Sequence, residues 1–110
     1  MSFQRASSQF AKARQILMLP HPNGEAVSVA QAFGEIDMGL ENLDQSKLDE
    51  SAKKWLAELK ELMNWKGIEV NAEEGRYLSK AKTLSLDERF ALSHLVDELQ
   101  CFFGEQARKQ

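Results

Sequence analysis

The chain lacks the features that mark secreted and membrane proteins. Its 110 residues include one cysteine, Cys101, so no disulfide can form within the chain, which is typical of a reducing compartment. No apolar run approaches the roughly 20 residues that a membrane-spanning helix needs. Residues 1–15 have neither a long apolar core nor a small-residue cleavage site, so no signal peptide is predicted. We therefore expect a cytoplasmic protein without a membrane segment.

Motifs that carry chemistry are also missing from the sequence. It has no glycine-rich phosphate loop, no CxxC or HxxxH metal spacing and no Glu-x-x-His pair of the kind that helix-bundle metal enzymes use. We accordingly predict no catalytic residues, no cofactor, no metal and no enzymatic activity.

The charge of the chain is slightly acidic and unevenly spread along the sequence. The formal net charge is −3, with 14 Lys and Arg against 17 Asp and Glu. Residues 1–24 carry three basic groups (Arg5, Lys12 and Arg14) and no acid, whereas residues 25–63 are rich in acids. Nucleic-acid binding usually needs a dense basic face, and three groups on one helix do not make one. Nucleic acid is therefore not an expected partner.

The strongest positive signal is an apolar stripe with helical spacing. At 100° per residue its members fall within about 120° of one another, which is typical of a one-faced helix. They are Leu48, Ala52, Trp55, Leu56, Leu59, Leu62 and Met63. The same period returns in residues 3–18, 25–42 and 86–103, which predicts an all-α fold, a compact bundle of four long amphipathic helices. Trp55 is then expected in the core, where replacing it by alanine costs about 3–5 kcal/mol.

Local signals predict where the first helix ends and where the third helix begins and ends. Two prolines in the segment 19–24 forbid continuation of the first helix. Ser46, followed three residues later by Asp49, resembles a capping box and predicts that the third helix starts there. Gly67 suits the left-handed position just beyond the end of that helix. Trp65, Ile68 and Val70 lie beyond this helix and need cover, so this connection is expected to fold back over the core.

The C-terminal part carries a shorter and a longer element. Residues 71–82 are compatible with a short helix or with an extended segment, because Gly75 weakens the helical pattern. Ser85 and Glu88 have capping-box spacing and predict the start of the last helix. Gly104 is expected to end it, with residues 106–110 frayed. Residues 1–110 are expected to form one domain.

The second helix has two irregularities. Val27, Ala30 and Gly34 form a patch that would let another backbone approach closely, or else the helix frays after Ile36. Asp37 plots near the middle of the apolar stripe. We expect a structural role for it, either as a cap of a neighbouring helix or at the edge of the stripe near the helix end.

One row on the last helix combines apolar and reactive side chains at spacings of four, four, three and four. Its members are Leu86, Phe90, His94, Asp97 and Cys101. Cys, His and Asp could form a thiol nucleophile or a metal site, but Cys101 lies seven residues beyond His94. That is about 10 Å along a helix, too far for a hydrogen bond. The row is interpreted as a candidate interaction face, covered either by the first helix or by another chain.

These observations favour a small, cytoplasmic, non-enzymatic protein-interaction module. Its partner is expected to be a protein, with a weak homodimer as one form of association. The alternative is a regulator in a nucleic-acid system, antitoxin-like or phage-derived, that uses the basic first helix or mimics nucleic acid with its acidic centre. Salt-dependent binding to DNA or RNA separates the two.

Overall fold

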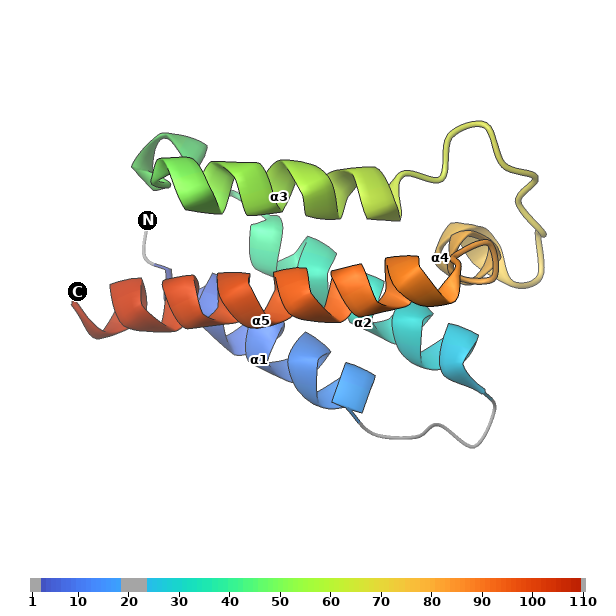
Figure 1. Cartoon of the computed structure of the whole chain (residues 1–110), viewed down its shortest axis with the longest axis horizontal. Coiled ribbons are helices and arrows are strands. Elements are labelled where there is room, and N and C mark those ends of the chain that lie inside the picture. The colour runs from blue at the N-terminus through green and yellow to red at the C-terminus, as the bar shows by residue number, and fades with distance from the viewer. Residues whose placement is uncertain (1–2, 19–23, 110) are drawn as a thin grey trace.

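The structure, a computed structural model, describes residues 3–18 and 24–109, and every regular element in these ranges is helical (Figure 1). This confirms the predicted all-α fold with four long helices and a short one within 71–82. The prolines that follow the first helix lie outside the described residues. The elements are α1 (Gln4–Met18), α2 (Glu25–Leu40), the 3₁₀ turn η1 (Gln45–Lys47), α3 (Glu50–Met63), α4 (Gly75–Ala81) and α5 (Leu86–Arg108).

The helices contact one another in a ring around one apolar core. α1 packs against α2 and α5, α5 packs also against α3, and the short α4 contacts both α2 and α3, which closes the ring. In Figure 1, α3 runs alongside α5, while α4 is seen nearly end-on beside the last turn of α3. The largest fully buried side chains come from four of the helices: Phe10, Phe33, Ile36, Leu59, Leu92, Val96, Leu99 and Phe103.

An aromatic cluster joins α1 to the C-terminal half of α5. The ring of Phe103 is stacked on Phe3, with centroids 5.7 Å apart, and meets Phe10 edge-on at 5.0 Å. Phe102 adds a further edge contact to Phe103 at 5.6 Å. These contacts place the start of α1 beside the end of α5 and run the two helices antiparallel.

The caps of the last two long helices can be compared directly with the sequence. Ser85 and Glu88 form the predicted capping box at the start of α5. The predicted start of the third helix at Ser46 is wrong, because α3 begins at Glu50 and Asp49 is its N-cap, accepting a 2.8 Å hydrogen bond from the Ala52 N–H. The Ser46 hydroxyl donates instead to Asp44 at 2.6 Å within η1, and Asp44 also accepts from the Ser46 N–H.

Two predicted helix ends are displaced. α3 ends at Met63, and Gly67, although left-handed with φ of 86°, lies in the turn that follows rather than next to the helix. Trp65 does not fold over the core, since its side chain is 40% exposed. α5 continues through Gly104 to Arg108, since a glycine permits a helix end but does not require one. The fraying expected beyond 106 stays a prediction.

Trp55 and the glycines of α2 also differ from expectation. Trp55 is only partly buried and packs at the margin of the core. α2 does not fray after Ile36, and the close helix approach is at Gly39 rather than at Gly34. A Cβ added to Gly39 would lie 3.0 Å from the Cβ of Gln9, whereas one added to Gly34 meets nothing within 4 Å.

Candidate functional site

All five residues of the predicted interaction face are exposed on the outer side of α5. Leu86 and Phe90 are 62% and 63% exposed, and His94, Asp97 and Cys101 are exposed as well. The expectation that the first helix covers this row is therefore wrong for its two large apolar members. We call Leu86, Phe90 and His94 the outer face of α5.

Leu86 and Phe90 stay exposed because of the way in which α1 crosses α5. α1 packs along the C-terminal half of α5, where Phe3 meets Phe103, and it reaches the row only at Asp97, which accepts a hydrogen bond from the guanidinium of Arg14. The N-terminal half of α5 has no such neighbour from α1. Cys101 is a free thiol. Among the described residues no three His, Cys, Asp or Glu side chains gather in a way that could hold a metal.

A second feature, not predicted from the sequence, is an open groove of about 830 Å³ between three helices. The C-terminal turn of α2, the second half of α3 and the first residues of α4 form its walls. Its lining residues are Asp37, Leu40, Glu41, Ala57, Lys60, Glu61, Met63, Asn64, Trp65, Lys66, Arg76 and Tyr77. We call this the α2–α3–α4 groove. Its volume is in the range of ligand sites in proteins.

The groove follows from the length of α4. α4 has seven residues, about 10 Å of helix, whereas α2 and α3 have 16 and 14 residues and are more than 20 Å long. α4 packs against both helices but is too short to fill the space between them along their length. The space that α4 leaves open is the groove.

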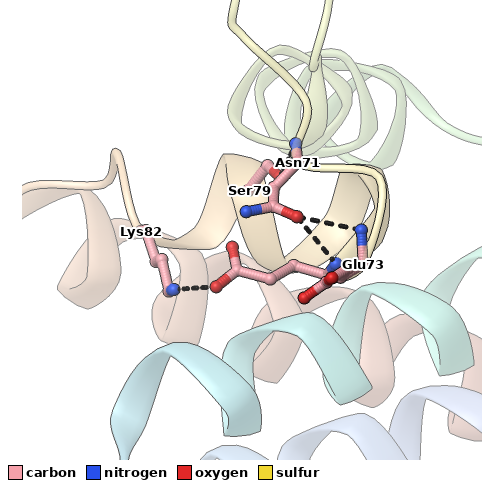
Figure 2. Close-up of polar contacts among 5 residues, drawn as sticks. Asn71, Glu73, Ser79 and Lys82 are labelled. Carbon is pink, nitrogen blue, oxygen red and sulfur yellow. Dashed lines mark hydrogen bonds and ion pairs between the residues drawn. The ribbon is translucent and has the colours of Figure 1, made fainter.

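Polar contacts fix the start of α4 and so position the groove residues that follow it (Figure 2). The side-chain oxygen of Asn71 accepts hydrogen bonds from the backbone N–H groups of Glu73 at 2.9 Å and Glu74 at 3.4 Å. The Asn71 N–H donates to the hydroxyl of buried Ser79 at 3.0 Å, and Lys82 pairs with the carboxylate of Glu74. Together these bonds tie the turn before α4 to the helix itself.

Arg76, the second residue of α4, lies between two aromatic rings of the groove. Its guanidinium carbon is 4.9 Å from the centre of the Tyr77 ring and 5.8 Å from that of Trp65, both within cation–π range. Its Nη2 also donates to the Tyr77 hydroxyl at 3.3 Å. No carboxylate of the described residues lies within ion-pair distance of this guanidinium. The cation is therefore held by aromatic faces and keeps most of its donors free.

The acidic side of the groove is less charged than its composition suggests. Glu41 is paired at 2.8 Å with Arg5 of α1. Partial burial raises the pKa of Asp37, an effect that Arg76 opposes and that neighbouring Glu41 reinforces. Asp37 is exposed at the edge of the apolar stripe. The structure therefore supports the predicted position at the edge of the stripe rather than the predicted role as a cap of a neighbouring helix.

The residues of the groove are far apart in the sequence, which is why no motif revealed them. The one signal that the sequence offers is the presence of Trp65, Arg76 and Tyr77 at the two ends of the connection between α3 and α4, where two aromatic residues flank a cation.

Comparisons with known proteins add no functional information. No protein-family model matches the chain, and the comparisons with curated proteins and with solved structures give no significant match. None of the helices in the described ranges combines the length and apolar character needed to cross a membrane.

Proposed function

We propose that the protein is a small, non-enzymatic, cytoplasmic interaction module that binds another protein through the outer face of α5. The observation that carries the proposal is the exposure of Leu86 and Phe90, which lie one turn apart at the capped start of a 23-residue helix. Scattered apolar residues are normal on a surface, but two large ones on one face of a rigid helix are suited to docking.

The size of this face favours a weak or regulated association. Complete burial of a Leu or Phe side chain contributes about 1.5–3 kcal/mol, so covering the exposed parts of these two contributes roughly 2–4 kcal/mol together. Such a contribution offsets only part of the cost of association, so flanking contacts at His94 or Asp97 must add to it. A second copy of the chain is the simplest partner, in a two-fold dimer.

The arrangement of α1 gives no support to the alternative of a nucleic-acid regulator. Two of its three basic side chains are already engaged, Arg5 with Glu41 and Arg14 with Asp97. Lys12 alone is exposed without such a partner among the described residues. Phosphate contacts by the arginines would have to compete with these ion pairs.

Phe90→Asp tests the proposal. Because Phe90 is mostly exposed, the variant is expected to melt within a few degrees of the wild type. It should shift a concentration-dependent monomer–dimer equilibrium toward monomer in sedimentation velocity. Ser51→Asp, which adds the same charge on the exposed side of α3, is the matched control and should behave as wild type.

Two results decide the matter. If the wild type is monomeric at all concentrations tested, self-association is excluded. The proposal then requires that a protein captured from native extract by the wild type fails to bind Phe90→Asp but still binds Ser51→Asp. A Phe90→Asp variant that matches the wild type in both measurements contradicts the proposal.

A further inference from the structure

We infer that the α2–α3–α4 groove is a second binding site, which takes an acidic peptide segment. A Glu or Asp side chain of the peptide pairs with Arg76, and an adjacent apolar side chain rests on Trp65. This inference does not depend on the function proposed for the outer face of α5, because none of the groove residues belongs to α5.

The choice of a carboxylate comes from the state of Arg76. A guanidinium presents donors in a planar fork that matches a carboxylate. Here the guanidinium lies within cation–π range of Tyr77 and Trp65, and its hydrogen bond to the Tyr77 hydroxyl adds a further contact that restrains it before an anion binds. The remaining donors have no carboxylate partner among the described side chains.

The rest of the groove adds to this preference. Lys60 and Lys66 line it and form no ion pair within the described chain, while the acidic Glu41 is neutralised by Arg5. The unpaired groups are then three cations against Asp37 and Glu61. The local field therefore favours an anionic ligand, although the whole chain is acidic.

The choice of a peptide comes from the shape and the apolar lining. The groove is open to solvent and lies between α2, α3 and α4, so a ligand is held along its length rather than enclosed. The partly buried Leu40 and the 40% exposed Trp65 supply apolar surface in the same groove as Arg76. A chain that alternates acidic and apolar side chains matches both features.

Asp37 limits where the carboxylate can bind. It lines the same groove and interacts electrostatically with Arg76. An incoming carboxylate is repelled by Asp37, so its replacement by asparagine is expected to strengthen binding.

The experiment is a fluorescence titration in a Trp55→Phe background, in which Trp65 is the only tryptophan. The probes are the peptides acetyl-Ala-Leu-Glu-Leu-Ala-amide and its neutral counterpart with Gln in place of Glu. We expect saturable binding of the Glu peptide in the millimolar range or tighter, and about two- to fivefold weaker binding of the Gln peptide, as suits a partly exposed ion pair.

Variants test the assignment of the carboxylate to Arg76. Arg76→Gln should remove the difference between the two peptides, and Asp37→Asn should strengthen binding of the Glu peptide alone. Lys54→Gln removes one positive charge on the exposed side of α3 outside the groove and should leave both affinities unchanged. Circular dichroism checks that each variant remains helical.

Three outcomes overturn the inference. They are the absence of a saturable response to the Glu peptide up to about 5 mM, several times the millimolar Kd expected, equal affinities for both peptides, and a difference between the peptides that persists in Arg76→Gln. A Glu-peptide response that Phe90→Asp leaves intact separates this site from the outer face of α5.

Discussion

Phe103→Ala is expected to bring the protein close to unfolding. Phe103 is fully buried and its ring contacts three others, those of Phe3, Phe10 and Phe102. Truncation of a buried Phe costs about 3–5 kcal/mol, and each lost aromatic pair adds about 0.5–1.5 kcal/mol beyond area burial. We therefore expect a loss near the upper end, about 5 kcal/mol. Domains of this size have only about 5–15 kcal/mol of unfolding free energy.

The assay is urea denaturation followed by circular dichroism, with Phe90→Ala as the matched control. Phe90 lies on the same helix but is 63% exposed, so its truncation should cost less than about 1 kcal/mol. Phe103→Leu, which keeps most of the volume, should fall between the two. A loss below about 2 kcal/mol for Phe103→Ala, or a larger loss for Phe90→Ala than for Phe103→Ala, would refute the packing of α1 on α5 described above.

Three further predictions concern the helices around the groove. Trp55→Ala should cost about 1–3 kcal/mol in the same assay, less than a core tryptophan would, because Trp55 is only partly buried. Gly34→Ala should stabilise the protein by up to about 1 kcal/mol, whereas Gly39→Ala should destabilise it through contact with Gln9; equal effects would argue against the close approach of α1 and α2. Asp37→Asn should raise the melting temperature at neutral pH, because the raised pKa of Asp37 means that folding disfavours its charged form. This destabilisation is present when the pH lies above the folded-state pKa and is lost as the pH falls through that pKa. The difference in melting temperature between the variant and the wild type should therefore shrink on acidification, and a constant difference would contradict this assignment.

The fold could be predicted because its signals are local. The stripe of α1 and the capping box of Ser85 and Glu88 each depend on residues within a few turns, and both appear in the structure. The errors arise where local signals compete or where a signal is permissive rather than decisive. Ser46 and Asp49 both have side chains that can cap a helix, and Asp49 caps α3 while the Ser46 hydroxyl donates to Asp44. Glycine permits a helix end without requiring one, and α5 continues through Gly104.

The outer face of α5 and the α2–α3–α4 groove also differ in how well the sequence predicts them. The outer face of α5 is one helical row, so spacing alone identified it, although whether α1 covered Phe90 depended on the angle at which the helices cross. The α2–α3–α4 groove brings Asp37, Lys60 and Arg76 together from three helices. The periodicity within one helix cannot predict that residues of three different helices lie in one groove.

The contact between Phe3 and Phe103 has a consequence for the order of folding. It joins positions about 100 residues apart, whereas the approach of α1 to α2 at Gln9 and Gly39 closes a loop of only about 30. The entropy of loop closure makes the longer loop about 1 kcal/mol more costly. Loop-closure entropy alone therefore favours contact between α1 and α2 before α1 meets α5, and mutations at Gly39 are expected to slow folding more than mutations at Phe103 do, relative to their effect on stability.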